Sequence, residues 1–279
     1  MKVSVALATY NGERYLAEQL DSLAGQTLTP AELVIADDGS CDHTTTIIES
    51  FRKKAPFPIP VMSGQHLGYV GNFFRAVKVC RGDVIALCDQ DDIWQPEKLS
   101  VCLNYFRHHV TLVMHSAQVI DSFGRPLNKR APIIARTREL PRGIFHDGPL
   151  KSFPLGFSLV IHRRVIDATM KALSFYPEIL GHYFGHEMPS YWMAKAQGNI
   201  VYLSRELVFY RRHEANTSQG QALKNEEITA GWHKDVAAYR EFGQHAQYQA
   251  DLLMALMTGS DPDTDAILIK MGPGKNPAE

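Results

Sequence analysis

Three short apolar runs in the N-terminal part of the chain each end in polar or acidic residues and are followed by the start of a helix. The runs cover residues 3–8, 33–36 and 84–88, and the polar residues after them begin with Thr9, Asp37 and Asp89. Runs of this length are typical of buried strands. Strands that alternate with helices predict a mainly parallel sheet covered by helices. Because ligands bind beyond the carboxyl ends of the strands in such a sheet, the three polar segments predict one site.

The alternation continues along the chain. We expect strands near residues 2–8, 32–36, 59–63, 83–88, 112–116 and 157–161, and helices near residues 12–24, 43–54, 70–80, 96–107, 164–173 and 187–197. Residues 125–150 are rich in arginine and are predicted to form a loop. The predicted main domain covers residues 1–218 and is followed by a helical C-terminal extension of residues 219–258. Residues 259–279 are rich in Pro, Gly and Asp, and we expect this tail to be disordered.

The strongest chemical signal is the acidic segment of residues 89–92 (Asp-Gln-Asp-Asp). Three carboxylates at one strand end repel each other and raise each other's pKa, so the cluster calls for a compensating cation. Oxygen ligands favour a hard divalent ion, Mg²⁺ or Mn²⁺. The alternative interpretation is a solvated acidic turn that caps the next helix.

The order of four motifs resembles that of the family 2 glycosyltransferases, which have the GT-A fold. The motifs are residues 9–12 (Thr-Tyr-Asn-Gly), 37–42 (Asp-Asp-Gly-Ser-Cys-Asp), 81–83 (Arg-Gly-Asp) and 89–94 (Asp-Gln-Asp-Asp-Ile-Trp). The last motif is similar to the rhamnosyltransferase-like branch, which builds bacterial surface polysaccharides. The resemblance implies an α/β fold with a Rossmann-like, mainly parallel sheet covered by helices and a C-terminal helical extension.

The resemblance extends to about residue 218. Residues 155–159 (Leu-Gly-Phe-Ser-Leu) are similar to the family's glycine-containing segment beneath the sugar. Residues 186–187 (His-Glu) occupy the place of the family's catalytic Asp or Glu residue. Residues 201–203 and 210–216 are similar to its last motifs.

The resemblance also implies residue roles at each of these motifs. The residues expected to contact the donor are Thr9, Tyr10, Asn11, Asp37, Asp38, Gly39, Asp89, Gln90 and Arg212. The residues expected to bind the divalent ion are Asp91, Asp92 and His213. Carboxylates can accept hydrogen bonds from ribose hydroxyls or a base N–H, and an arginine fork can bind a diphosphate. Two alternatives stay open: Asp89 can join the metal instead of the ribose, and Arg211 can bind phosphate instead of Arg212.

Glu187 is the expected catalytic base, which accepts the proton of the attacking acceptor hydroxyl. It lies at the start of a predicted helix, where the helix dipole favours an ionised carboxylate. The same position also fits a carboxylate that only complements the dipole. The family more often has Asp here, so Glu187 is one methylene longer than the usual residue. His186 is the next candidate for the base or for an acceptor contact.

We therefore expect a metal-dependent, inverting glycosyltransferase. It moves a sugar from a UDP- or dTDP-linked donor to a hydroxyl of a glycan or lipid-linked acceptor in surface polysaccharide synthesis. One rival is a sugar-phosphate nucleotidyltransferase, but residues 8–13 lack the glycine-rich basic loop that it requires after the first strand. The other rival is a non-catalytic module that binds sugar nucleotides or glycans.

Bulk composition favours an enzyme of the cytoplasm. The net charge of −1 gives no general attraction to nucleic acid. The four cysteines have neither metal-binding spacing nor a disulfide framework. The chain begins with a strand and its apolar runs are shorter than about 20 residues, so we expect neither a signal peptide nor a membrane span. Peripheral contact with the inner membrane surface is compatible with this composition, and the oligomeric state is not readable from it.

Overall fold

The computed structural model describes residues 1–143, 154–175, 185–214 and 216. The chain divides into two units, residues 1–144 with 148–213 and residues 145–147 with 214–279, and the sheet and helices described below belong to the first. The predicted C-terminal extension (219–258) and disordered tail (259–279) lie outside the described residues, and the domain boundary at residue 218 stays a prediction. None of the described helices is long and apolar enough to cross a membrane.

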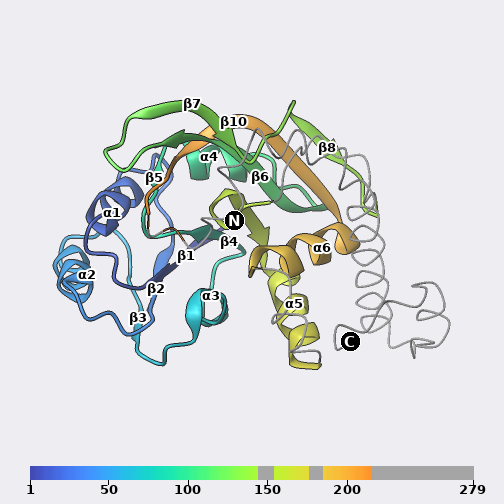
Figure 1. The fold of residues 1–279 in the computed structure, drawn as a ribbon. Helices are drawn as coiled ribbons and strands as arrows, with labels where there is room; N and C mark the ends of the chain where they lie inside the picture. The colour runs from blue at the N-terminus through green and yellow to red at the C-terminus, as the bar shows by residue number, and fades with distance from the viewer. Residues whose placement is uncertain (144–153, 176–184, 215, 217–279) are drawn as a thin grey trace, which may run out of the picture. The chain divides into compact units, whose positions relative to one another are not determined.

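A mixed β-sheet forms the centre of the first unit (Figure 1). Within the described residues it has ten strands, with the main order β3-β2-β1-β4-β9-β6-β10-β5, while β7 pairs with β6 and β8 with β10. The strands are β1 (Val3–Thr9), β2 (Glu32–Asp37), β3 (Val61–Ser63), β4 (Val84–Cys88), β5 (Ile93–Trp94), β6 (Val110–Ile120), β7 (Pro126–Ala131), β8 (Arg138–Leu140), β9 (Leu159–His162) and β10 (Asn199–Arg211).

The sheet combines a parallel part with a mixed part. Strands β3, β2, β1 and β4 run parallel, as the sequence predicts. Strand β9 then joins antiparallel to both β4 and β6, whereas β6 and β10 run parallel to each other. The α/β fold class is confirmed, with less parallel pairing than expected because β9, β5, β7 and β8 all enter antiparallel.

Helices cover the parallel part of the sheet on both faces. The helical segments are α1 (Leu16–Ala24), α2 (Thr44–Arg52), α3 (Gly68–Val79), α4 (Lys98–Leu103), the 3₁₀ turn η1 (Gly156–Ser158), α5 (Arg163–Phe175) and α6 (Glu187–Gln197). All seven residues of β1 are buried. Val5 and Leu7 belong to the same core cluster as Leu16 and Leu20 of α1, and α3 packs on β1 and β2. Burying each such side chain contributes about 1.5–3 kcal/mol.

Four strands of the structure were not predicted as strands: β5, β7, β8 and β10. The region 125–150 is not a loop throughout, because β7 and β8 lie within it. Strand β7 is almost wholly exposed, so its sequence lacks the alternation of apolar and polar residues that would predict a strand. Strand β10 has 13 residues and was not predicted as a strand. Its apolar pattern is interrupted by residues 204–206 (Ser-Arg-Glu), where its register with β6 also shifts. All six predicted helices are present and the range of α6 is the predicted one, but α4 covers only Lys98–Leu103 of the predicted 96–107.

Candidate functional site

The carboxyl ends of three neighbouring strands bring the first predicted site residues together. Thr9 at the end of β1 pairs with Asp37 at the end of β2. Leu7 pairs with Cys88, the last residue of β4. Asp89 follows Cys88 directly, so it emerges at the same edge of the sheet. The convergence predicted from the three polar segments is therefore present in the fold.

Hydrogen bonds join the loops after β1 and β2. Asn11 has a left-handed φ of 47°, its N–H donates to Ser40 Oγ (2.9 Å), and its Oδ1 accepts from the N–H of Cys41 (3.0 Å). Asp37 is buried and accepts from the N–H of Ser40 (3.1 Å). Gly39 has a φ of 91°, which favours glycine. These groups shape the loops, and their contact with a donor stays a prediction.

Asp38 caps the N-terminus of α3. Its Oδ1 accepts from the N–H of Leu67 (2.7 Å) and its Oδ2 from the N–H of Gly68 (2.8 Å). These are two backbone donors that have no partner within the helix. The predicted contact of Asp38 with a ribose or base would therefore use lone pairs that remain on oxygens already bonded to the chain.

Gln90 holds the residues that follow β1. Its Oε1 accepts from Thr9 Oγ1 (2.6 Å) and from the N–H of Tyr10 (2.9 Å), and its Nε2 donates to the Tyr10 carbonyl (3.2 Å). The Tyr10 residue stays half exposed. The amide of Gln90 thus fixes the loop that presents Tyr10, while its predicted donor contact stays untested.

The acidic segment after β4 is buried and its carboxylates repel one another. Burial, together with the charges of Asp91 and Glu187, raises the pKa of Asp89 to about 8. Burial, with the charges of Asp91 and Asp89, also holds the pKa of Asp92 well above its ordinary range. Asp92 is fully buried. A cation close to these carboxylates would relieve the repulsion.

Lys98 is a buried cation beside the acidic segment, and the sequence reasoning missed it. Its Nζ donates to the carbonyl of Phe157 (2.8 Å) and lies 3.2 Å from the ring centroid of Trp94. Burial lowers the pKa of Lys98 to about 7, and the charges of Asp92 and Asp89 act against that shift. Lys98 is also the first residue of α4, a short helix with ordinary composition, so no pattern in the sequence singles it out.

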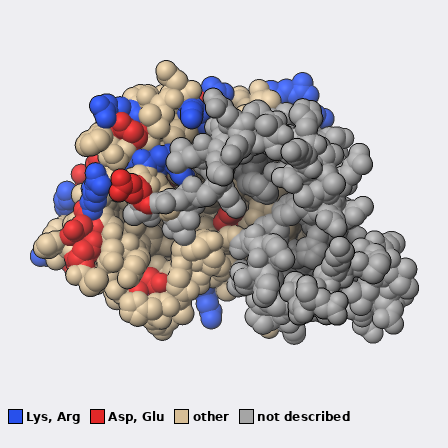
Figure 2. Space-filling view, viewed as in Figure 1, with Lys and Arg blue, Asp and Glu red and all other residues tan. Residues whose placement is uncertain are grey.

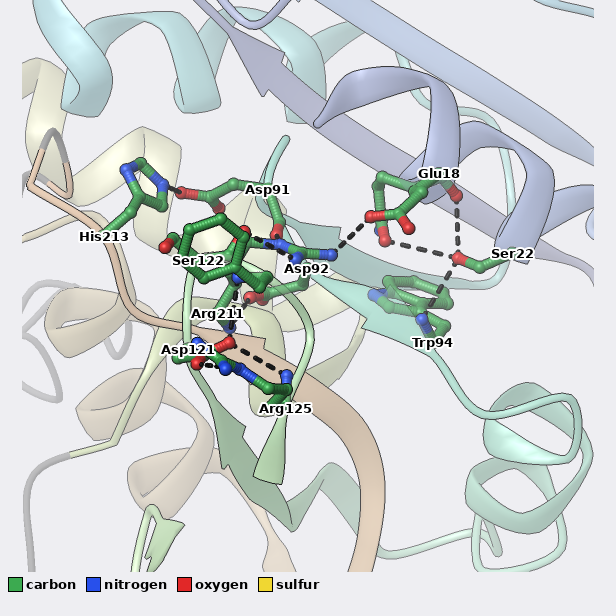
Figure 3. A network of polar contacts seen from close by, with 12 residues as sticks. Glu18, Ser22, Asp91, Asp92, Trp94, Asp121, Ser122, Arg125, Arg211 and His213 are labelled. Carbon is green, nitrogen blue, oxygen red and sulfur yellow. Dashed lines mark hydrogen bonds and ion pairs between the residues drawn. The ribbon is translucent and has the colours of Figure 1, made fainter. Parts of the chain in front are cut away.

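Arg211 anchors the acidic segment to the rest of the fold (Figure 3). Its backbone N–H donates to Asp92 Oδ1 (3.0 Å) and its Nε to the carbonyl of Asp91 (2.9 Å). Its Nη1 donates to the carbonyl of Ser122 (3.4 Å), and its Nη2 forms an ion pair with Glu18 of α1. Arg211 therefore has a structural role here that the sequence prediction did not include.

His213 and Asp91 are the predicted metal ligands that lie together. His213 Nε2 is 2.7 Å from Asp91 Oδ2, and Tyr15 packs against the His213 ring at 4.7 Å. Asp92 instead accepts a hydrogen bond from the backbone N–H of Arg211 through Oδ1. Its Oδ2 is buried without a hydrogen-bond partner among the described residues. Within the described residues, no group of three His, Cys, Asp or Glu side chains is arranged to hold an ion. The oxygen and nitrogen donors of Asp91 and His213 fit a divalent ion whose other ligands are phosphates and waters.

Arg212 lies beside Tyr210. It is buried, and its Nη1 donates to the hydroxyl of Tyr210 (2.7 Å). The Tyr210 ring stacks on Phe157, at a centroid distance of 4.7 Å. A phosphate contact of Arg212 stays a prediction.

Glu187 lies within electrostatic reach of the acidic segment, since its charge raises the pKa of Asp89. Burial raises the pKa of Glu187 itself to about 7. His186, the residue before it, stacks on Phe73 at a centroid distance of 3.7 Å, and its Nδ1 lies 3.5 Å from Glu187 Oε2. Burial lowers the pKa of His186 to about 3, so its ring is neutral. A carboxylate with a pKa near neutrality is suited to accept a proton.

A comparison with protein families decides the classification. A sequence profile described as glycosyl transferase family 2 matches residues 4–169, which is more than half of the chain. The chain belongs to glycosyl transferase family 2. The matched range contains the three strand ends and the acidic segment, so the predicted family is confirmed by the residues that suggested it.

Two relatives illustrate the family membership. A glycosyltransferase of uncharacterised function from Nostoc is 28% identical over 242 residues, which cover 82% of this chain and 70% of the relative. The dTDP-rhamnosyl transferase RfbG of Shigella flexneri is 39% identical over 98 residues, which cover 33% of this chain and 34% of the relative.

A solved structure shows the same fold. The structure of Staphylococcus aureus TarS 1–349 in complex with UDP-GlcNAc aligns with a TM-score of 0.59 at 18% identity. The alignment covers 97% of this chain and 70% of that one. At this level of identity the likeness concerns the fold, and the individual residue roles at this family 2 site stay predictions.

Proposed function

We propose that this family 2 protein is an inverting glycosyltransferase that uses a UDP- or dTDP-linked sugar and a hydroxyl of a glycan or lipid-linked acceptor. The observation that carries the proposal is the combination of Glu187 with the acidic segment. Glu187 is a largely buried carboxylate whose pKa is raised to about 7, and its charge raises the pKa of Asp89 in the acidic segment. In this proposal the Glu187 carboxylate is the base, and the acidic segment would hold the cation that binds the leaving diphosphate. Surface polysaccharide synthesis is the proposed setting.

The names of the relatives support the substrate class. RfbG is a dTDP-rhamnosyl transferase, and TarS is a poly(ribitol-phosphate) β-N-acetylglucosaminyltransferase whose structure has been solved with UDP-GlcNAc. The first name gives a dTDP-linked donor, the second gives a polymer acceptor, and the TarS structure contains a UDP-linked sugar. We propose the same general class here, without assigning the sugar.

In the proposed reaction Glu187 accepts the proton of the acceptor hydroxyl as that oxygen attacks the anomeric carbon. Attack from the face opposite the leaving nucleoside diphosphate inverts the configuration. The half-exposed Tyr69 lies close to Glu187, whose charge adds to burial in raising the tyrosine's pKa. Its ring offers a surface for the sugar or the acceptor beside the base.

Asp91 and His213 are the residues proposed to hold Mg²⁺ or Mn²⁺. When bound, the ion would neutralise charge that develops on the leaving diphosphate. Arg211 keeps Asp91 in place through the Asp91 carbonyl. Tyr10, which Gln90 holds in place, is proposed to border the uracil or thymine base of the donor nucleotide. The loops that contain Asn11 and Asp38 are proposed to surround that nucleotide base.

A thermal-shift panel tests the donor part of the proposal. We expect UDP- or dTDP-sugars to stabilise the protein, and Mn²⁺ to increase that stabilisation. Asp91→Ala should remove the Mn²⁺-dependent part. Asp21→Ala, at an exposed position on α1, serves as the matched control and should retain it. If no nucleotide sugar stabilises the protein, or if Asp91→Ala behaves as the control does, the donor-site assignment is wrong. Binding without any transfer would instead favour the non-catalytic module.

A further inference from the structure

A basic and partly apolar surface lies beside the site. We name residues 123–142 the basic ribbon; they contain β7 and β8. The ribbon has six Lys and Arg residues against Glu139 as its acidic residue, a net charge of +5, although the whole chain has a net charge of −1. Figure 2 shows Lys and Arg side chains along the upper rim of the molecule, where Figure 1 places β7 and β8. Positive charge is therefore concentrated on this segment.

Several ribbon cations have no acidic partner among the residues that the structure describes. Arg125 pairs with Asp121, and Arg130 pairs with Glu206. Within the described part of the chain, no ion pair involves Lys129, Arg136, Arg138 or Arg142, and all four are exposed. A folded protein usually intersperses charges of both signs on its surface. A run of unbalanced cations fits an anionic partner better than it fits self-contained folding.

The ribbon also exposes large apolar side chains. Phe123 is 74% exposed, and Leu127 and Ile133 are each 41% exposed. The guanidinium of Arg125 lies 5.0 Å from the centroid of the Phe123 ring. Apolar and cationic groups are thus mixed on one short segment. A soluble polyanion would engage only the cations, whereas the boundary between lipid headgroups and acyl chains accommodates both kinds of side chain.

We propose that the basic ribbon docks the protein on the surface of an anionic phospholipid bilayer. Phe123 and Leu127 enter the headgroup region, and the unpaired cations contact lipid phosphates. The proposed attachment is peripheral, through side chains of the basic ribbon. The proposal is independent of the reaction that the site performs.

The ribbon is connected to the acidic segment through Asp121, Ser122 and Arg211. Arg125 is bonded to Asp121 at the end of β6 (2.9 Å), and the neighbouring Ser122 carbonyl accepts from Arg211, which also holds Asp91 (Figure 3). A docked ribbon would therefore keep the acidic segment close to the lipid surface. If the proposed function holds, this places the site where a lipid-linked acceptor is presented; that consequence rests on the proposed function, while the docking does not.

Vesicle co-sedimentation of the full chain, without donor or metal, tests the docking. We expect binding to phosphatidylcholine vesicles that contain phosphatidylglycerol, weaker binding at high salt, and little binding to phosphatidylcholine alone. The variant Lys129→Glu/Arg136→Glu/Arg138→Glu should bind at least about 100-fold more weakly, because each cation near an anionic surface contributes roughly fivefold. The variant Phe123→Ser/Leu127→Ser should also bind more weakly, by roughly tenfold.

The matched control is Lys53→Glu/Lys78→Glu/Arg81→Glu, which makes the same charge change at exposed positions just after α2, on α3 and after α3. It should bind as the wild type does, and melting temperatures should confirm that all variants fold. Equal weakening of the control would show that net charge alone decides binding, and would overturn the proposal. Unchanged binding of the Phe123→Ser/Leu127→Ser variant would overturn it too, since the surface would then be a site for soluble polyanions. Absence of any preference for anionic vesicles would have the same consequence.

Discussion

At the scale of single residues, Glu187 combines burial with a position at the start of α6. Its side chain is 20% exposed, and burial raises its pKa to about 7. Transfer requires the ionised carboxylate, so the rate should rise with pH and level off above about pH 7. A pH–rate profile of the wild type checks this. A rate that is flat between about pH 5 and 9, under conditions where chemistry limits turnover, would exclude Glu187 as the base.

The same pKa predicts how stability depends on pH. Between the ordinary Glu pKa of 4.5 and about 7, the folded protein keeps a proton on Glu187 that the unfolded chain has lost. The free energy of unfolding therefore falls as pH rises through that window. Above the window, the folded state carries the full cost of keeping Glu187 ionised in its buried position. Glu187→Gln removes that cost and should be more stable than the wild type at pH 8 by roughly 1–3 kcal/mol, with the difference vanishing near pH 4. Urea denaturation at both pH values measures it.

Asp38 provides a second prediction at this scale. Asp38→Ala leaves the N–H groups of Leu67 and Gly68 without their carboxylate partner. We expect a loss of roughly 1–3 kcal/mol in the free energy of unfolding, measured by urea denaturation. Asp21→Ala, which is exposed, should change stability by less than about 0.5 kcal/mol. If Asp38→Ala loses nucleotide affinity but no stability, Asp38 acts on the ligand and not on α3.

The residues that sequence reasoning found and those it missed differ in how they are connected. Thr9, Asp37 and Asp89 each follow an apolar run, and strand pairing alone makes them neighbours. Arg211 reaches Asp91 across 120 positions of sequence, and a sequence gives no sign of such a pairing. The sequence did not predict the position of Lys98 for a similar reason, because its burial depends on packing against Trp94 and Phe157.

At the scale of elements, η1 supports the start of α6. A Cβ on Gly156 would lie 2.6 Å from His186 Nε2, and His186 cannot retreat because it stacks on Phe73. Gly156→Ala should therefore displace His186 and the adjoining Glu187. We expect a loss of about 10- to 100-fold in turnover with little change in nucleotide affinity. Gly25→Ala, where the nearest atom is 3.5 Å away, is the control and should turn over normally. Normal turnover of Gly156→Ala would show that the contact does not position the base.

Arg211 connects three elements, since it bonds to the acidic segment after β4, to α1 and to the turn after β6. A lysine cannot reproduce this fork of donors. Arg211→Lys should cost about 1–3 kcal/mol in stability and should weaken Mn²⁺-dependent nucleotide binding. Arg205→Lys, on the same strand with an exposed partner in Glu97, should cost less than about 1 kcal/mol. Equal effects of the two changes, measured by urea denaturation and calorimetry, would contradict the role given to Arg211.

The elements that were predicted well are those whose pattern is local. The helices have apolar residues at regular spacing, and the burial of β1 on both faces agrees with its mainly apolar sequence, which Ser4 interrupts. Strands β7 and β10 are defined by their pairing with β6. Their composition is polar or interrupted, so the information that makes them strands lies in distant residues.

At the scale of the whole molecule, the parallel and mixed parts of the sheet contribute different residues to the proposed site. The parallel part ends in the loops of Thr9, Asp37 and Asp89, which are proposed to receive the nucleotide. The mixed part contributes Arg211 and the neighbouring His213 from the end of β10, while Glu187 comes from the helix before that strand. The site is assembled only when both parts of the sheet are in place, because His213 and Asp91 come from different parts.

The central claim is that Glu187 is the base of a family 2 glycosyltransferase. The most direct measurement is release of nucleoside diphosphate from the donor selected by thermal shift, with Mn²⁺ and a glycan acceptor at about pH 8, for the wild type, Glu187→Gln and the control Glu49→Gln at an exposed position on α2. We expect Glu187→Gln to bind the donor with wild-type affinity and to lose about 10²–10⁴-fold in turnover, while Glu49→Gln keeps full activity. Turnover of Glu187→Gln at the wild-type rate would contradict the claim.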